Sequence, residues 1–129
     1  VCSSDLEPSH HVTWLYALTA KPEKGQRLRE QIVHDFYSTR PDGIVGNDDV
    51  GQMSAWLIFT ALGFYPAQPF SGQYVTGSPL VESAVLHLNS GRRLRISGHG
   101  MHVTLNGQPV NPTALPHALV AGGGDLRFD

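Results

Sequence analysis

The sequence predicts an α+β fold, with helices in the first half of the chain and short strands in the second. Up to about residue 62, apolar residues recur at the spacing of a helix, and after Pro69 they alternate with polar residues as strands require. Turns containing glycine and asparagine separate the alternating segments. A chain of 129 residues with 40% hydrophobic residues can form one ordinary domain with its own core.

Two helices are expected before residue 40. The first begins near residue 8, and its predicted apolar side is made by Val12, Leu15, Tyr16 and Thr19. The second begins at Pro22, which suits the first position of a helix. Its predicted core side carries Leu28, Ile32 and Phe36, and its other sides carry Glu23, Lys24, Arg27 and Arg29.

A third helix is expected from about residue 50 to Leu62. Asp49 followed by Gln52 has the form of a capping box, in which a side chain before the helix accepts a hydrogen bond from an early amide. Gly63 suits the left-handed position that ends a helix. The helix has almost no polar side, so we expect it to be buried inside something larger than this chain.

The second half is predicted to be an antiparallel strand region. The expected strands are residues 74–77, 84–88, 94–97, 102–105, 108–110 and 126–128, with a possible short edge strand at 119–120. Residues 89–91 and 98–100 are read as turns between strands, and Asn106-Gly107 is a strong signal for a two-residue hairpin.

Composition excludes several classes of protein. A net charge of −2 with nine Lys and Arg residues predicts no nucleic acid or anionic lipid partner. No apolar run approaches the roughly 18 residues of a membrane span. A single cysteine, Cys2, excludes an internal disulfide framework. Residues 1–6 read as the translation of a common sequencing adapter, so we expect them to be a non-native leader and the natural sequence to begin near Glu7.

The first stretch rich in reactive groups is residues 7–11. Glu7, His10 and His11 bring a carboxylate and two imidazoles to the start of the first helix. Adjacent residues on a helix point about 100° apart, so the two histidines would seldom share one metal. The alternative is an ordinary helix start, with Ser9 as the cap and Glu7 favoured by the helix dipole.

The second stretch is residues 46–52, where Asp48 and Asp49 stand between glycines. A carboxylate cluster on such a loop can hold a hard cation or activate a water molecule. The alternative role, a cap supplied by Asp49, leaves Asp48 without an explanation. His99 and His102 also have a metal-like spacing, but they fall at a predicted turn with no carboxylate or cysteine nearby, so we expect them to face solvent.

These stretches resemble glycoside hydrolase family 92. The resemblance is carried by Glu-Pro-Ser-His-His at 7–11 and by Gly-Asn-Asp-Asp-Val-Gly-Gln-Met-Ser-Ala-Trp at 46–56, with further matches at 36–37, 41–43, 61–66 and 74–80. The resemblance implies a calcium-dependent exo-α-mannosidase that inverts the anomeric carbon of mannose-containing glycans, N-glycans included. It also implies a β-sandwich packed on an (α/α)6 barrel, with residues 7–66 as the end of the barrel and residues 67–129 as a C-terminal β-strand region.

The same resemblance implies roles for individual residues. Asp49 would be the catalytic base, with Asp48 as the second candidate, and Glu7 would lie beside the calcium ion. His10, His11 and Asn47 would line the substrate pocket, in roles that the sequence does not separate. The general acid and the β-sandwich would lie upstream, so this piece alone is expected to be inactive without the missing N-terminal part of the same chain. The resemblance also implies export to the periplasm or cell surface of a bacterium.

Two other functions remain open at this stage. A non-catalytic carbohydrate-binding module would use the strand half, with Trp14, Trp56 and Tyr74 as stacking platforms for sugars. A degenerate homologue would keep the fold but lack a working site. Unchanged turnover after substitution of Asp49 would favour the second of these.

Overall fold

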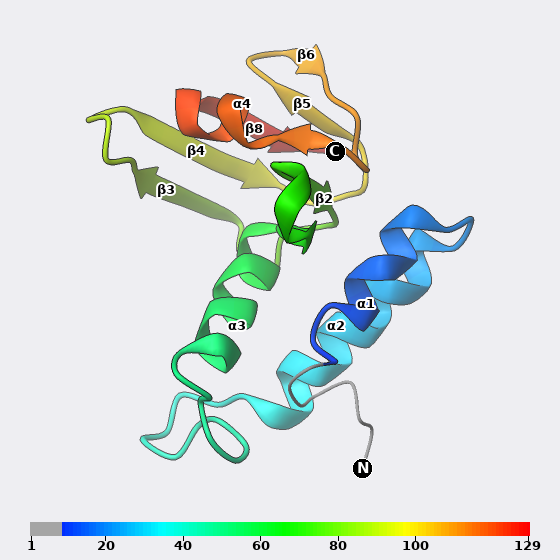
Figure 1. Ribbon diagram of the computed structural model, residues 1–129, viewed down its shortest axis with the longest axis vertical. Coiled ribbons are helices and arrows are strands. Elements are labelled where there is room, and N and C mark those ends of the chain that lie inside the picture. The colour runs from blue at the N-terminus through cyan, green and yellow to red at the C-terminus, as the bar shows by residue number, and fades with distance from the viewer. Residues whose placement is uncertain (1–8) are drawn as a thin grey trace.

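The structure is a computed structural model that describes residues 9–129. The predicted leader at 1–6 and the predicted metal ligand Glu7 lie outside these residues. Within them, helices and two sheets form an α+β fold, as predicted. The larger sheet lies at one end of the molecule and the helices at the other, with the smaller sheet between them (Figure 1).

The first helix is shorter than predicted and buries a different side. α1 spans Val12–Leu15 and continues as a 3-10 turn, η2, over Tyr16–Leu18. Thr13 and Trp14 are buried, whereas the predicted apolar residues Val12 and Leu15 are exposed. The prediction was wrong because Trp14, which it left off the core side, is the largest apolar group of the segment, and its burial sets the rotation of the helix.

The second helix, α2, spans Pro22–Phe36 and begins at proline as predicted. Ile32 lies on its buried side, but so does Arg29, which was expected to face solvent. Arg29 is 1% exposed because its guanidinium lies 3.9 Å from the centre of the Trp14 ring. It donates to the carbonyl of Thr13 at 2.9 Å and to Oε1 of Gln26 at 2.8 Å. Burial lowers the pKa of Arg29 to about 10, so it stays charged at neutral pH.

The third helix, α3, spans Gln52–Leu62 and ends at Gly63, whose φ of 84° is the predicted left-handed conformation. Met53, Trp56 and Leu62 are buried against the described chain. Ile58 is 58% exposed on the same apolar helix. The described residues therefore cover one side of α3 and leave another apolar side open to solvent.

The smaller sheet joins the helices to the larger sheet. Its strands, in the order β1-β2-β7, are Phe64–Gln68, Gln73–Thr76 and Leu115–Pro116, all antiparallel. Another 3-10 turn, η3, spans Pro69–Ser71 and connects β1 to β2. β1 and β7 were not predicted. The predicted boundary between residues 66 and 67 stays a prediction, and it falls inside β1.

The larger sheet has the order β3-β4-β8-β5-β6. Its strands, in chain order, are β3 (Ser83–His87), β4 (Arg93–Gly98), β5 (Val103–Leu105), β6 (Gln108–Pro109) and β8 (Gly124–Phe128). The predicted hairpin between β5 and β6 is confirmed, with φ values of 51° at Asn106 and 79° at Gly107.

The expectation of a wholly antiparallel region was wrong. β8 pairs with β4 in parallel and with β5 antiparallel, so residues 98–100 connect two strands that are not neighbours. The predicted edge strand at 119–120 is part of a helix, α4 (His117–Gly122). This helix belongs to the connection that carries the chain back to the start of β8, and a parallel pair requires such a crossover.

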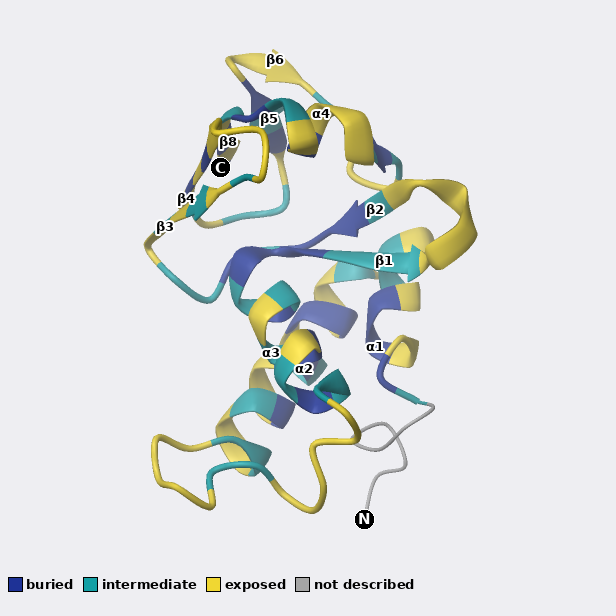
Figure 2. Ribbon diagram, turned by 60° about the vertical axis from the view of Figure 1, so that its left-hand side comes forward, coloured by how far each residue is buried: buried dark blue, intermediate teal, exposed yellow. Residues whose placement is uncertain are grey.

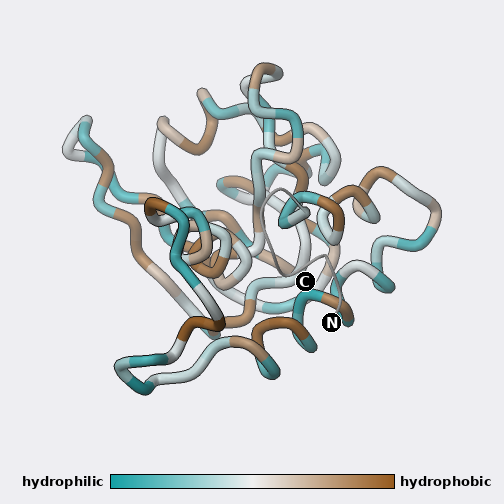
Figure 3. Tube along the Cα trace, turned by 60° about the horizontal axis from the view of Figure 1, so that its bottom comes forward, coloured by the Kyte–Doolittle hydropathy of each residue, from teal (hydrophilic) through white to brown (hydrophobic). Residues whose placement is uncertain are grey.

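Residues 9–129 bury two hydrophobic cores. The first is built by Leu62, Phe64, Leu94, Ile96, Val103, Leu105, Leu115, Val120, Leu126 and Phe128, and the second by Trp14, Ile32, Trp56 and Val75. Figure 2 shows buried residues on β2 and where the helices meet the smaller sheet. Hydrophobic residues are spread along the trace in Figure 3, and no helix among residues 9–129 is long and apolar enough to cross a membrane.

Gly25 allows α1, η2 and α2 to approach closely. A Cβ atom at Gly25 would lie 2.5 Å from Cβ of Tyr16 and 2.7 Å from the carbonyl oxygen of Thr13. Gly25→Ala is therefore expected to lower the free energy of unfolding by about 2 kcal/mol, since overpacking outweighs the roughly 1 kcal/mol gain in helix propensity. Urea denaturation of the wild type and the variant measures this change in the free energy of unfolding. Gly122→Ala is the control, because its Cβ would meet nothing within 4 Å. Equal effects of the two substitutions would contradict the packing argument.

Candidate functional site

The two stretches that carry reactive groups lie together in the structure. His10 is 2% exposed, and its carbonyl accepts a hydrogen bond from Nε1 of Trp56 at 2.9 Å. Its ring Nδ1 lies 3.1 Å from Nε2 of Gln52, and its ring centre lies 5.8 Å from that of Trp56. The start of α1 is therefore fixed against the start of α3.

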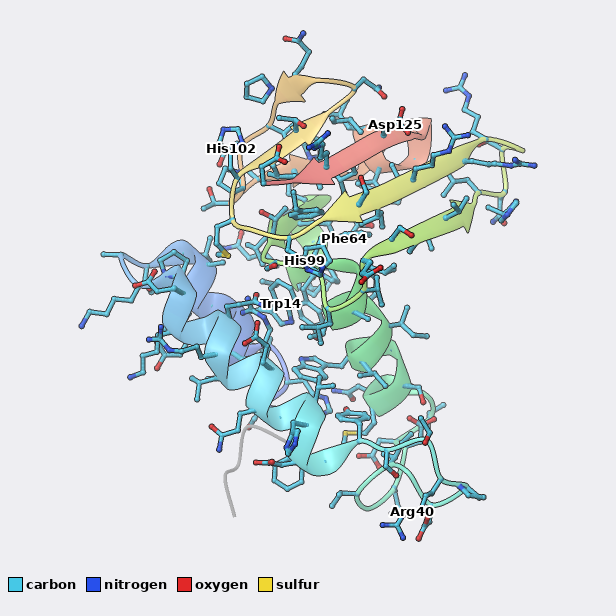
Figure 4. All side chains as sticks on the ribbon, turned by 180° about the vertical axis from the view of Figure 1, so that it is seen from behind. Trp14, Arg40, Phe64, His99, His102 and Asp125 are labelled. Atoms are coloured by element: carbon cyan, nitrogen blue, oxygen red, sulfur yellow. The ribbon has the colours of Figure 1, made fainter. Side chains whose placement is uncertain are left out.

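The loop between α2 and α3 holds the second stretch. Tyr37 and Ile44 form an antiparallel bridge that closes the first part of the loop. The hydroxyl of Tyr37 donates to the carbonyl of Met53 at 3.1 Å, which ties the end of α2 to the first turn of α3. Figure 4 shows Arg40 in this loop, far from His99 and His102 at the larger sheet.

The loop ends in three successive residues with left-handed backbone. The φ angles are 49° at Asp49, 60° at Val50 and 91° at Gly51. Only glycine adopts this region freely, and a β-branched residue there is a rare outlier. Val50 is fully exposed, so its own packing does not stabilise the conformation. Backbone strain of this kind occurs preferentially at functional sites.

Asp48, not Asp49, is hydrogen-bonded to the first turn of the third helix, whose N-cap residue is Gly51. Oδ1 of Asp48 accepts hydrogen bonds from the backbone amide of Ser54 at 2.9 Å and from its hydroxyl at 3.0 Å. The predicted capping box of Asp49 and Gln52 is wrong, because the residue directly before α3 is Gly51. Asp49 has left-handed backbone, whereas a capping residue normally has extended backbone.

The Asp49 carboxylate is exposed, and it has no hydrogen bond or ion pair within residues 9–129. Asn47 and His11 are exposed as well. The structure thus divides the predicted site residues into two groups. His10 is buried, whereas His11, Asn47, Asp48 and Asp49 are exposed, and the Asp48 carboxylate is hydrogen-bonded to Ser54.

Sequence reasoning missed the partners that hold the site. Gln52 and Trp56 contact His10, and Ser54 contacts Asp48. One signal was available, since Gln52 and Trp56 are four residues apart and therefore lie on one side of a helix. Their common partner, 42 and 46 residues away, could not be read from spacing.

The described residues do not form a calcium site by themselves. Calcium takes six to eight oxygen ligands. Among residues 9–129, no group of three or more His, Cys, Asp or Glu side chains is placed to hold a metal ion. Glu7, the predicted calcium ligand, is one of the residues that the structure does not describe.

The aromatic platforms proposed for sugar stacking are mostly inaccessible. Trp14 and Trp56 are fully buried, so neither can stack on a sugar. Tyr74 is partly exposed, and its hydroxyl lies 2.7 Å from Nδ1 of His117 at the edge of a hollow of about 270 Å³. His99 and His102 are exposed, as predicted, and Nδ1 of His99 lies 3.0 Å from the carbonyl of Pro79.

Comparison with known proteins identifies the family. Residues 3–129 match the sequence profile of the glycosyl hydrolase family 92 catalytic domain. The chain belongs to glycoside hydrolase family 92. Among curated proteins, it is 24% identical over 133 residues to a protein described as an uncharacterized secreted glycosidase from Arthroderma benhamiae.

Solved structures of the family share the fold. A family GH92 α-mannosidase from Bacteroides thetaiotaomicron, determined in complex with mannoimidazole, superposes with a TM-score of 0.87 at 35% identity over 96% of this chain. A family GH92 inverting mannosidase from the same organism gives a TM-score of 0.82 at 32% identity over 95% of this chain. The chain spans 17% of the first structure, 18% of the second and 17% of the curated glycosidase.

Proposed function

We propose that this chain is the C-terminal part of an inverting, calcium-dependent exo-α-mannosidase that removes mannose from glycans. The observation that carries the proposal is the difference in hydrogen bonding between the two neighbouring aspartates. Both carboxylates are exposed, but Asp48 accepts two hydrogen bonds from Ser54 in the first turn of α3, whereas the Asp49 carboxylate makes none within residues 9–129.

The geometry of Asp49 suits a general base. An inverting glycosidase needs one carboxylate to deprotonate a water molecule and a carboxylic acid roughly 6.5–9.5 Å away to protonate the leaving oxygen. In this proposal Asp49 is the base, His11 and Asn47 bind sugar hydroxyls, and the general acid comes from another part of the full-length protein.

The relatives support the substrate class and the stereochemistry. Two solved structures that resemble this chain are described as α-mannosidases or mannosidases, and one of them as inverting. The curated relative is described as a secreted glycosidase, which supports export from the cell. We place the full-length protein in the periplasm or on the surface of a bacterium, where it would meet N-glycans and other mannose-containing glycans.

Calcium enters the proposal through Glu7. The carboxylate of Glu7, which lies outside the described residues, would supply one oxygen ligand, and the remaining ligands would include groups of the full-length protein and of the sugar. When bound, calcium would supply a hard cation that favours oxygen ligands such as sugar hydroxyls. This chain's own residues perform the proton transfer, and Asp49 takes the proton from water.

The exposed apolar residues of the helices support the barrel architecture. Val12, Leu15, Leu18 and Ile58 lie open to solvent on α1, η2 and α3. We propose that they pack against preceding helices, with residues 7–66 forming the last part of an (α/α)6 barrel. Without those helices and the general acid, the 129-residue chain alone is expected to hydrolyse no glycoside.

Turnover of an α-mannobiose by the full-length protein tests this function. Activity is expected with calcium present, is expected to disappear with a chelator, and is expected to return when calcium is added back. Product anomers followed by NMR should show inversion. No activity on any α-mannoside would instead support a carbohydrate-binding or degenerate homologue.

A further inference from the structure

His10 connects the two stretches that form the site, and its environment differs from that of His11. The ring of His10 is enclosed by protein at 2% exposure, whereas His11 is exposed. We propose that His10 is a positioning residue that holds the first turn of α3, and with it the Asp49 loop, and that His11 is the histidine that faces the sugar. This inference rests on the proposed role of Asp49 as the base.

The contacts of His10 fix α3 at two successive turns. Gln52 and Trp56 are four residues apart, so they lie on one side of the helix. The first contacts the ring of His10 and the second contacts its carbonyl, at 3.1 Å and 2.9 Å. Two contacts one turn apart restrict both the position of the helix start and its rotation about its axis.

Movement of Gln52 would be transmitted directly to Asp49. The amide of Gln52 donates to the carbonyl of Asp49 at 3.3 Å, and only two residues separate them. Those two residues and Asp49 itself have left-handed backbone. Such a segment persists only where surrounding contacts hold it. Contacts are present on both sides of the segment, with Asp48 bonded to Ser54 before it and Gln52 beside His10 after it.

His10 is itself anchored to the second helix through its neighbours. The carbonyl of Thr13 accepts a hydrogen bond from the buried guanidinium of Arg29, and this guanidinium lies over the ring of Trp14. Trp14 also stacks on Tyr65, with ring centres 5.5 Å apart. The segment that carries His10 is therefore held to α2 and β1, and it can act as a fixed support for α3.

Hydrogen-bond chemistry gives the two ring nitrogens of His10 different roles. Nε2 of Gln52 can only donate, so Nδ1 of His10 is the acceptor in this contact. An asparagine side chain places a polar atom near the position of Nδ1, and a glutamine side chain places one near Nε2. Substitution by these two amides therefore separates a positioning role through Nδ1 from ligand contact through Nε2.

The kinetic test compares His10→Ala, His10→Asn and His10→Gln in the full-length protein with α-mannobiose and calcium. His10→Ala is expected to lower kcat by roughly 10-fold to 100-fold with little change in KM, since the base is displaced while sugar contacts remain. His10→Asn should recover most of this loss and His10→Gln should not. Gln52→Met should match His10→Ala, and the double variant should be no worse than either single one.

Hydrogen–deuterium exchange gives a readout that does not need activity. Amides of residues 45–56 should exchange faster in His10→Ala, His10→Gln and Gln52→Met than in the wild type, and close to the wild-type rate in His10→Asn. Unchanged exchange in all four variants, or rescue by Gln instead of Asn, would overturn the positioning role. If the wild type turns over no mannoside, the proposed function fails, and the order of exchange rates still decides the role of His10.

Discussion

Asp49→Asn in the full-length protein is expected to lower kcat for an α-mannobiose by roughly 100-fold to 10,000-fold, the usual contribution of a general base. Asparagine has the shape of aspartate but cannot accept the proton from water. Because the Asp49 carboxylate is exposed and makes no hydrogen bond within residues 9–129, the substitution should leave the melting temperature unchanged. Steady-state kinetics and thermal unfolding of the same preparation measure both quantities.

Asp48 is the matched control for this prediction. It stands next to Asp49, yet its carboxylate is hydrogen-bonded to Ser54 in the first turn of α3. Asp48→Ala should lower the free energy of unfolding by about 1 kcal/mol because two hydrogen bonds from Ser54 are lost, whereas asparagine keeps an acceptor oxygen and should keep stability near the wild type. Asp48→Asn should therefore retain most activity. If it abolishes turnover and Asp49→Asn does not, the base is Asp48 and the assignment made here is wrong.

Arg29→Ala is expected to lower the free energy of unfolding by about 3 kcal/mol or more, because buried acceptors lose a charged donor and a cavity opens. The acceptors are the carbonyl of Thr13 and Oε1 of Gln26, and the cavity would lie against Trp14. Arg29→Lys should be intermediate, because an ammonium group cannot lie flat on an indole while it donates to both acceptors. Urea denaturation followed by tryptophan fluorescence measures the loss.

Arg27 provides the comparison on the same helix. It is exposed and has no ion pair among residues 9–129, so Arg27→Ala should change stability by no more than about 0.5 kcal/mol. If Arg27→Ala and Arg29→Ala lowered the free energy of unfolding by similar amounts, the buried guanidinium of Arg29 would contribute no more to stability than an exposed arginine does.

Local signals in the sequence predicted the parts of the fold that local chemistry decides. Pro22 starts α2, Gly63 ends α3, and Asn106-Gly107 forms the hairpin, each in the conformation that its residue type favours. These features depend on a few neighbouring residues, so one sequence was enough to find them.

Contacts between distant residues decided the features that were missed. Arg29 has the spacing of a surface residue, and its burial depends on Trp14 and on the Thr13 carbonyl from another element. The parallel pairing of β8 with β4 joins residues about 30 apart through a crossover that residues 98–100 do not reveal. Hydrophobic periodicity carries no information about either partner.

In the candidate site, too, local sequence predicted some features and contacts between distant residues decided the others. The stretches that contain His10 and Asp49 were identified from residue types, and the structure places them at neighbouring helix starts. Which of two adjacent residues is engaged depends on backbone conformation. With the left-handed turn at 49–51, Asp48 and not Asp49 is hydrogen-bonded to Ser54, and the contacts with Gln52 and Trp56 bury His10 instead of His11.

The central place of β8 has a consequence for biosynthesis. β8 lies between β4 and β5, so neither of those strands has its full set of partners until Gly124–Phe128 has emerged from the ribosome. The helices can form during translation, because their hydrogen bonds are local, but the larger sheet must wait for its middle strand. Until then the facing edges of β4 and β5 carry unpaired backbone groups, which offer another chain a template for strand pairing.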